Sequence, residues 1–241
     1  MKVLVTGSDG QLAREIKELV GLQKSLNYFV FRNRVDLDIC NYDSVFEYIV
    51  ENDIDIVINC AAYNNVDLAE DNIHIARSVN SNAILNLVNA LKEVNGKLIH
   101  ISTDYVFDGT NSKPYIETDT VNPLSAYGKT KSEGENIIFN SSVDAIVIRT
   151  SWLFSAYGDN FLKKILKIAN KNDKISVISD KVGSPTYAED LAKTCLKMLN
   201  DSKFNEIIKN EKLYHFSNEG AASWYDFASA IIDYGKINCN S

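Results

Sequence analysis

Short runs rich in Val and Ile alternate with longer segments of helical apolar spacing over most of the chain. The expected strands are residues 2–6, 28–31, 55–59, 97–102 and 145–150, and the expected helices are residues 11–22, 43–50, 79–94, 125–139 and 160–169. Strands that alternate with helices favour a parallel sheet covered on both faces, and nearly continuous apolar strands suit the middle of such a sheet. We therefore predict an α/β fold with a Rossmann-like, doubly wound parallel sheet.

The alternation loosens after residue 150. Segments around residues 175–178, 188–199, 213–216 and 224–234 predict a smaller α/β lobe that folds against the end of the sheet. We expect one domain over residues 1–150 and a second over residues 151–241. A chain of 241 residues is long enough for one substantial core with such an appendage.

Charge and composition exclude several classes of protein. Lys and Arg number 25 against 32 Asp and Glu, and the resulting net charge of −7 repels a phosphate backbone, so we expect no nucleic-acid partner. No apolar run approaches the roughly 20 residues of a membrane-spanning helix, and the first residues lack the apolar core of a signal peptide. We expect a cytoplasmic protein without a membrane partner.

The four cysteines, Cys40, Cys60, Cys195 and Cys239, lie far apart and form no C-x-x-C pair. This spacing argues against a disulfide framework and against a structural metal site. We therefore expect buried free thiols and no metal.

The first predicted strand runs into a glycine-spaced turn that opens a helix. Gly7 and Gly10 are separated by two residues, and Gln11 and Leu12 begin the helix. Absent side chains let a backbone approach a pyrophosphate, whose charge then faces the positive end of the helix dipole. Ala13 fills the third position of this dinucleotide fingerprint, where close helix packing admits alanine. The alternative is a plain strand-to-helix turn.

The second predicted strand ends where a dinucleotide fold reads the adenosine ribose. An acid there suits NAD and an arginine suits the 2′-phosphate of NADP, and this chain has Asn33 between Arg32 and Arg34. We expect NADPH, with NADH as the alternative, although both arginines could equally be solvated. Asp38 and Ile39 are candidates to bind the adenine amino group and ring, and Asp38 could instead cap a turn.

Tyr127 and Lys131 are four residues apart at the start of a predicted helix, which places both on one face. A cation about 5 Å from a phenol stabilises the phenolate by about 3 kcal/mol at an effective dielectric of 20, or roughly 2 pKa units. We therefore predict that Lys131 lowers the pKa of Tyr127, which would act as a proton donor. The alternative is an aromatic residue packed beside a surface lysine.

Ser102 and Thr103 follow the fourth predicted strand. Ligands of doubly wound sheets lie at the carboxyl ends of the strands, so a hydroxyl here can bind the oxygen that Tyr127 protonates. The alternative is that either hydroxyl only satisfies a turn.

Taken together, these motifs resemble the extended short-chain dehydrogenase/reductases, and within that family most closely the reductases of dTDP-activated 4-keto-6-deoxy sugars. The segments that carry the likeness, beside the glycine turn, are residues 57–63 (VINCAAY), 66–70 (VDLAE), 102–109 (STDYVFDG), 122–123 (NP), 127–131 (YGKTK), 149–154 (RTSWLF) and 183–186 (GSPT). The likeness extends from Met1 to about Phe227.

The resemblance implies a hydride transfer from NADPH or NADH to the C4 ketone of the sugar, in the synthesis of a cell-surface polysaccharide precursor. It implies that Tyr127 donates the proton, that Lys131 also holds the nicotinamide ribose, and that Thr103 binds the ketone oxygen. The remaining implied contacts are Ala61, Ala62, Tyr63 and Ser102 for the cofactor, and Asp104 and Trp152 for the nucleotide sugar, which is the expected partner. Trp152 could instead be a core residue, and Asn80 matches a position that is most often structural.

The resemblance also defines the domains: residues 1–150 would bind the cofactor and carry Tyr127 and Lys131, and residues 151–241 would bind substrate. Family members continue beyond the segment at residues 223–227 further than this chain does, so we expect a shortened substrate lobe. Two other functions stay open: an epimerase or dehydratase that keeps its NAD bound, and a non-catalytic NADP-binding regulatory subunit. Relatives can form homodimers, so a homodimer is possible.

Overall fold

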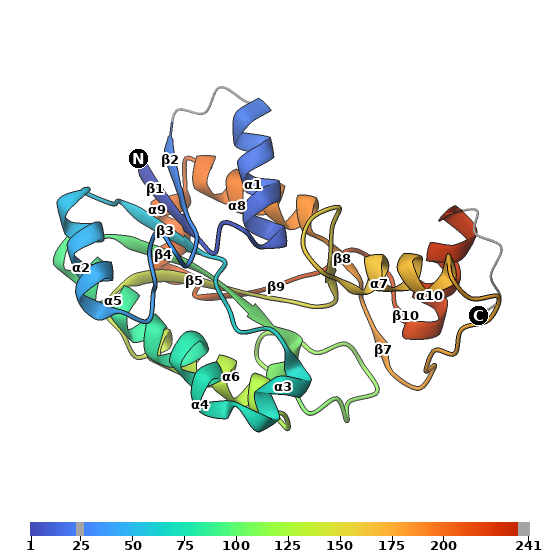
Figure 1. Ribbon diagram of the computed structural model, residues 1–241. Coiled ribbons are helices and arrows are strands. Elements are labelled where there is room, and N and C mark those ends of the chain that lie inside the picture. Colours follow the sequence, from blue (N-terminus) through green and yellow to red (C-terminus); the bar gives the residue numbers. More distant parts are fainter. Residues whose placement is uncertain (23–26, 236–241) are drawn as a thin grey trace.

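The computed structural model describes residues 1–22 and 27–235 (Figure 1). In this part of the chain six parallel strands form one sheet in the order β2-β1-β3-β4-β5-β9. The strands are β1 (Lys2–Thr6), β2 (Tyr28–Arg32), β3 (Ile56–Asn59), β4 (Lys97–Thr103), β5 (Asp144–Thr150) and β9 (Leu213–Phe216). The strand order reverses between β1 and β3, which creates a crevice beyond their carboxyl ends. The predicted doubly wound sheet is confirmed.

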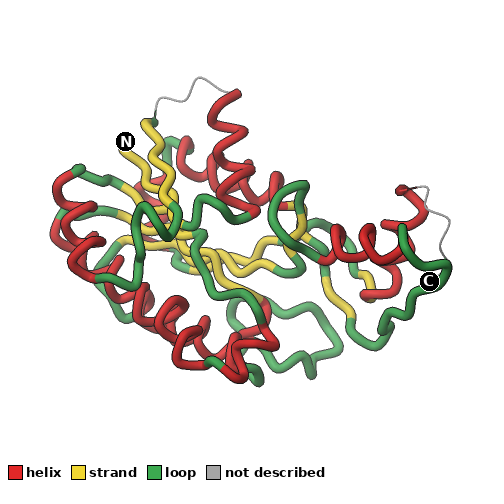
Figure 2. Tube along the Cα trace, viewed as in Figure 1, coloured by secondary structure: helices red, strands yellow, loops and turns green. Residues whose placement is uncertain are grey.

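Two layers of helices cover the sheet, as Figures 1 and 2 show. One face packs against α1 (Gln11–Leu22), α8 (Ala188–Asn200) and α9 (Phe204–Asn210). The other face packs against α2 (Tyr42–Glu51), α5 (Ala83–Glu93) and α6 (Ala126–Phe139). Because alternate residues of each strand point to opposite faces, Val3 and Val5 enter the first apolar cluster and Leu4 enters the second. Each such buried aliphatic side chain stabilises the fold by about 1.5–3 kcal/mol.

The connection between β3 and α5 differs from the single helix predicted over residues 79–94. The chain forms α3 (Val66–Asp71), α4 (Ile73–Arg77) and then a π-helical turn at Ser78–Asn82 before α5 begins at Ala83. Asn80 in this turn accepts a hydrogen bond from the Tyr63 N–H (2.9 Å) and donates to the Thr130 hydroxyl (3.1 Å). These side-chain bonds tie the turn to α6 and to the end of β3, which apolar periodicity does not reveal.

A smaller lobe lies beside the carboxyl ends of the strands (Figure 1). Its core joins α7 (Phe161–Ala169) to α10 (Trp224–Gly235), and its short strands are β7 (Val182–Gly183) with β10 (Ala222–Ser223) and β6 (Leu153–Phe154) with β8 (Thr186–Tyr187). Ile175 and Val177, in the expected segment 175–178, pack against this core without forming a strand. A smaller lobe was predicted beyond residue 150, but it does not contain all of the segments that were predicted for it.

Two segments predicted for the small lobe belong to the main sheet instead. In the structure α8 packs against α1, and β9 pairs with β5 as the edge strand of the six-stranded sheet. The prediction was wrong for residues 188–199 and 213–216, because their apolar pattern marks a helix and a strand without identifying the layer that they join. The division of the chain into domains at residue 150 stays a prediction.

Cys40, Cys60 and Cys195 are free thiols, and Cys239 lies outside the described residues, as does the rest of segment 236–241. Within the described ranges, no three His, Cys, Asp or Glu side chains gather in a way that could hold a metal ion. None of the described helices combines the length and apolarity needed to cross a bilayer.

Candidate active site

The glycine turn lies at the crevice between β1 and β3. Gly7 adopts a φ of +64°, and a Cβ at this position would lie 2.7 Å from the backbone nitrogen of Ala61. Both facts require glycine, because a side chain would be strained and would strike the segment that follows β3. The Gly10 N–H donates to the Gly7 carbonyl (2.9 Å), which closes the turn directly before α1.

The start of α1 presents backbone N–H groups beside this turn. The first helical hydrogen bond runs from Arg14 N to Gly10 O (3.1 Å), so the N–H groups of Gln11 and Leu12 precede the helical ladder. The Leu12 side chain is buried in the core, and Gln11 bonds the small lobe, where its Oε1 accepts from Asn160 Nδ2 (2.8 Å). The two predicted cofactor residues could therefore bind an anion through their backbone.

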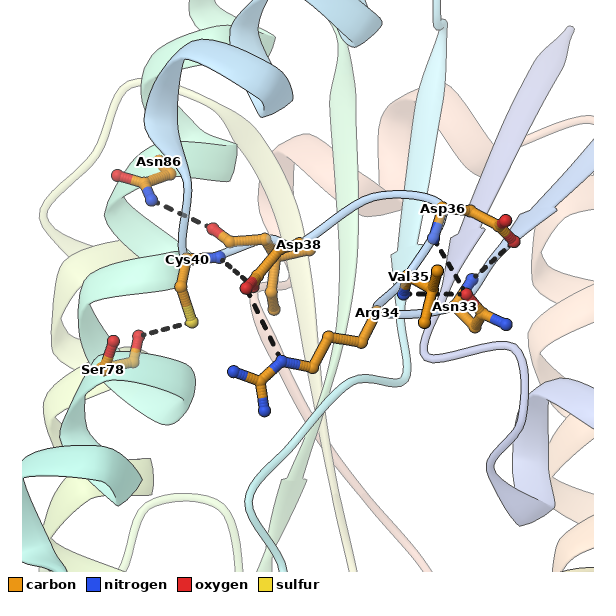
Figure 3. Close-up of polar contacts among 9 residues, drawn as sticks. Asn33, Arg34, Val35, Asp36, Asp38, Cys40, Ser78 and Asn86 are labelled. Carbon is orange, nitrogen blue, oxygen red and sulfur yellow. Dashed lines mark hydrogen bonds and ion pairs between the residues drawn. The ribbon is translucent and has the colours of Figure 1, made fainter.

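The end of β2 carries the expected ribose-binding residues, of which Asn33 and Arg34 are shown in Figure 3. Asn33 Oδ1 accepts hydrogen bonds from the N–H groups of Val35 (2.9 Å) and Asp36 (3.0 Å), so this side chain orders its own turn. The Arg32 guanidinium lies over the Tyr48 ring at 5.2 Å, and the exposed Arg34 pairs with Asp38 at 3.6 Å. Two guanidinium groups therefore lie at the end of β2.

Asp38 and Ile39 have structural roles here. Asp38 Oδ1 accepts from Cys40 N (3.0 Å), which matches the turn-capping alternative. Ile39 is 5% exposed and lies in the apolar cluster under α2, while its carbonyl accepts from Asn86 Nδ2 (3.0 Å; Figure 3). The structure thus directs the Ile39 side chain into the core rather than toward an adenine ring.

Ala61, Ala62 and Tyr63 follow β3, and the Ala61 backbone lies directly against Gly7 of the glycine turn. Tyr63 is held through its backbone by Asn80, and its side chain packs with Tyr127 against the small cluster of Ala69, Ala76 and Ala126. The predicted structural role of Asn80 agrees with these contacts. The segment after β3 is thereby tied to the beginning of α6.

Tyr127 lies in the first turn of α6. The helix is capped by Ser125, whose hydroxyl accepts from Gly128 N (3.0 Å), and Glu70 accepts from Ala126 N (2.8 Å). A Cβ at Gly128 would clash with the Tyr105 carbonyl, so this glycine lets the helix approach the 3₁₀ turn at Asp104–Val106. The close approach sets Tyr127 beside the end of β4.

At that point the Thr103 side chain lies near the Tyr127 phenol, close enough to influence its pKa. The effect of Lys131 on the pKa of the phenol stays a prediction. Burial raises the pKa of Tyr127 well above its usual value, and the nearby Thr103 hydroxyl opposes the rise. The phenol is therefore a protonated donor over the whole neutral range.

Lys131 is buried and turns its amine toward the sheet. Its Nζ donates to the Ile101 carbonyl (2.7 Å) and lies 3.1 Å from His100 Nε2. Burial lowers its pKa to about 8. Sequence spacing correctly placed Tyr127 and Lys131 on one helix, but it could not show that the amine faces a histidine of β4.

The Ser102 hydroxyl points away from the crevice, into a buried ion pair. It donates to Glu135 Oε1 (2.5 Å), and Arg149 Nη2 donates to Glu135 Oε2 (2.6 Å). Ser102 was predicted to contact the cofactor, whereas its hydroxyl serves the packing of α6 on the sheet in this structure.

Asp104 is the titratable residue beside the Thr103–Tyr127 pair. Thr103 Oγ1 donates to Asp104 Oδ1 (3.1 Å), and burial raises the pKa of the carboxyl to about 6. A carboxyl that titrates near neutrality at the mouth of a site is a candidate functional group.

Trp152 lies where the chain leaves β5 for the small lobe. Its φ of +47° is rare for a bulky residue, and its ring stacks on Trp224 with centroids 3.6 Å apart and planes 7° apart. A Cβ at Gly183 would lie 2.6 Å from the same indole. The partly exposed Trp152 side chain thus packs against residues of the small lobe. It is not a buried core residue.

Sequence reasoning missed His100, Glu135 and Arg149 as site residues. Each is a polar or charged residue in an otherwise apolar or buried position, and Glu135 follows Lys131 by one helical turn. Asn59 was quoted only as part of a motif, yet it bonds His100 directly (3.0 Å). The signal that could have found His100, Asn59 and Arg149 is the interruption of apolar strands by polar residues, whereas Glu135 is a charged residue on a buried helix face.

Comparisons with known proteins agree with this geometry. The family model described as RmlD substrate binding domain matches residues 1–239. A dTDP-4-dehydrorhamnose reductase of Aggregatibacter actinomycetemcomitans is 41% identical over 233 residues, which is 96% of this chain and 78% of the relative.

Two solved structures of dTDP-4-dehydrorhamnose reductases superpose with TM-scores of 0.92. That from Clostridium acetobutylicum is 38% identical and covers 100% of this chain and 82% of its own. That from Bacillus anthracis, in complex with NADP, is 34% identical and covers 99% of this chain and 83% of its own. The chain belongs to the dTDP-4-dehydrorhamnose reductase family.

Proposed function

We propose that this protein is an NADPH-dependent reductase that converts dTDP-4-dehydrorhamnose to dTDP-rhamnose for polysaccharide synthesis. The observation that carries the proposal is that the hydroxyl of Thr103, at the end of β4, and the hydroxyl of Tyr127, in the first turn of α6, lie near each other on the side of the sheet where the strands end. Two hydroxyls that converge on one point can bind and protonate a single oxygen atom. The relatives named above are reductases of this sugar nucleotide.

The residues present fit a reduced nicotinamide dinucleotide, which would supply the hydride. The turn at Gly7 and Gly10 has no side chain to fill the approach to α1, whose first N–H groups suit a pyrophosphate. Arg32 and Arg34 at the end of β2 suit the 2′-phosphate that distinguishes NADPH from NADH. This preference agrees with the NADP complex of the Bacillus anthracis relative.

Tyr127 would donate its proton to the alkoxide oxygen that forms at C4, while Thr103 holds the same oxygen by a hydrogen bond. The raised pKa of Tyr127 suits this direction, because the phenol must carry its proton until charge develops on the substrate. Lys131, one turn along α6, would hold the nicotinamide ribose, and Ala61, Ala62 and Tyr63 would line the same ligand. Ser102 would act indirectly, through Glu135.

Asp104 and Trp152 would contact the nucleotide sugar, with the small lobe as the wall opposite the sheet. The Trp152 indole offers a flat apolar surface held at the junction of the lobes by Trp224. We also propose the division of labour in which residues 1–150 carry the cofactor and catalytic groups. A cytoplasmic location and a homodimer belong to the same proposal.

The experiment is to follow the absorbance of NADPH with freshly prepared dTDP-4-dehydrorhamnose. Turnover by the wild type, reduced at least about 100-fold in Tyr127→Phe, would support the proposal, because a positioned acid contributes that much. Wild-type rates in Tyr127→Phe would refute the role of the phenol. Protein that purifies with one equivalent of tightly held NAD and does not oxidise NADPH would instead indicate an epimerase or dehydratase.

A further inference from the structure

A row of three polar side chains crosses the sheet beneath α6. Thr6, Asn59 and His100 are neighbours in register on β1, β3 and β4, and they are 1%, 0% and 0% exposed. The row below them on the same sheet face is apolar, with Leu4, Val57 and Leu98 in the core. Buried polar groups in such a place must satisfy one another.

The hydrogen bonds along the row have one consistent direction. Asn59 Oδ1 accepts from the Thr6 hydroxyl (2.6 Å) and from the backbone N–H of Ala61 (3.3 Å). A backbone N–H can only donate, so it identifies which end of the amide is the oxygen. Asn59 Nδ2 therefore points to His100 Nδ1 (3.0 Å) and donates to it.

This direction fixes the tautomer of His100. A ring nitrogen that accepts carries no proton, so the proton of the neutral imidazole must be on Nε2. That N–H faces the amine of Lys131 at 3.1 Å, and the amine in turn donates to the Ile101 carbonyl. The amine then accepts from His100, which only an unprotonated amine can do.

We propose that His100, oriented by Asn59, is a positioning residue that holds the Lys131 amine and governs whether it carries a proton. The effect of this contact on catalysis rests on the proposed function. The protonation of His100 and Lys131 can be measured in the ligand-free protein without it. A proton taken up from solvent by Lys131 makes two donors face one another. The ammonium then turns away from His100 toward the crevice, where ribose hydroxyls of the cofactor could accept its hydrogen bonds.

The other charged groups near this pair do not replace the effect. Glu135 lies one turn along α6, but its carboxylate is bound to Arg149 from β5. Cys60 after β3 keeps its proton, because burial raises its pKa well above the usual value. Tyr127, on the preceding turn of α6, is neutral for the same reason. Burial also lowers the pKa of His100 well below its usual value, which agrees with a neutral ring.

The direct test is nitrogen NMR of the ligand-free protein labelled with ¹⁵N-histidine, since the chain has three histidines and His100→Gln assigns the relevant signal. From about pH 7 to about pH 9 we expect a neutral ring with the proton on Nε2. In Asn59→Ala we expect the Nδ1 tautomer to become populated. A wild-type ring protonated on Nδ1, or charged, would overturn the proposal whether or not the enzyme reduces any sugar.

A second experiment measures the protonation of Lys131 through the pH dependence of NADPH binding. The affinity for NADPH should fall with rising pH as Lys131 loses its charge. In His100→Gln the midpoint of this fall should lie about one pH unit higher, because a glutamine oxygen can accept a hydrogen bond from the ammonium and so stabilise it. His215→Gln is the matched control, since His215 lies on the same sheet face but contacts Arg149 (3.4 Å). If NADPH affinity depends on pH in the same way in wild type and His100→Gln, His100 does not control the protonation of Lys131. Because this test measures binding, it can be interpreted even if the protein does not reduce the sugar nucleotide.

Discussion

Glu135 and Arg149 form an ion pair between α6 and β5 in which the carboxylate and guanidinium are 2.6 Å apart and the side chains are 2% and 5% exposed. The pair joins the helix that carries Tyr127 to the sheet beneath it. The Ser102 hydroxyl supplies a further hydrogen bond to the carboxylate. The position of α6 on the sheet thus depends on an ion pair that is almost completely buried.

Glu135→Gln should destabilise the protein by about 3–5 kcal/mol, because it leaves the Arg149 charge buried without its partner. Urea unfolding followed by circular dichroism measures this loss. Glu133→Gln on the same helix is the control: its pair with Arg77 is 38% and 44% exposed, so the loss should stay below about 1 kcal/mol. Equal losses in the two variants would contradict the role given to burial.

Asp104→Asn should raise stability above pH 6. The folded pKa of about 6 exceeds the ordinary 3.8, so the native state holds a proton that the unfolded chain releases, and stability falls as pH rises between these values. Replacing the carboxyl removes up to about 3 kcal/mol of this penalty. Thermal unfolding at pH 4 and pH 8 should show a gain only at the higher pH, and an equal gain at both would exclude a charge effect.

Gly7→Ala should abolish NADPH binding, because the new Cβ would strike the Ala61 backbone and the residue would be strained at φ +64°. Gly109→Ala separates strain from contact. Gly109 also has a positive φ, of +73°, but a Cβ there meets nothing within 4 Å. The Gly109→Ala variant should therefore be less stable by about 1 kcal/mol, while its affinity for NADPH, measured by fluorescence titration, should equal that of the wild type.

Trp224→Leu should raise the KM for the sugar nucleotide about tenfold, since an aromatic pair is worth about 0.5–1.5 kcal/mol beyond its area and Trp152 loses its support. Trp224→Phe keeps a stacking ring and should stay within about threefold of wild type. Steady-state kinetics separate KM from kcat, which should change little. An unchanged KM in Trp224→Leu would show that Trp152 needs no support for substrate binding.

The sheet, the glycine turn and the Tyr127–Lys131 pair could be predicted because each is a local pattern. The partner of Lys131 could not, because His100 lies 31 residues away and meets it only after α6 packs on β4. Ile39 shows the converse: the motif matched an adenine contact, while packing under α2 decided where the side chain lies. Local spacing determines which residues share an element, and tertiary packing determines what their side chains face.

The return of the chain to the main sheet has a consequence for synthesis on the ribosome. When residue 150 has emerged, β5 is an open edge and the face under α8 and α9 is bare, because residues 188–216 that cover both come later. Exposed edges and bare apolar faces promote aggregation. The nascent chain therefore passes through a stage at which Tyr127 and Lys131 have been synthesised but the sheet that carries them is still uncovered. Chaperone binding should peak at this stage.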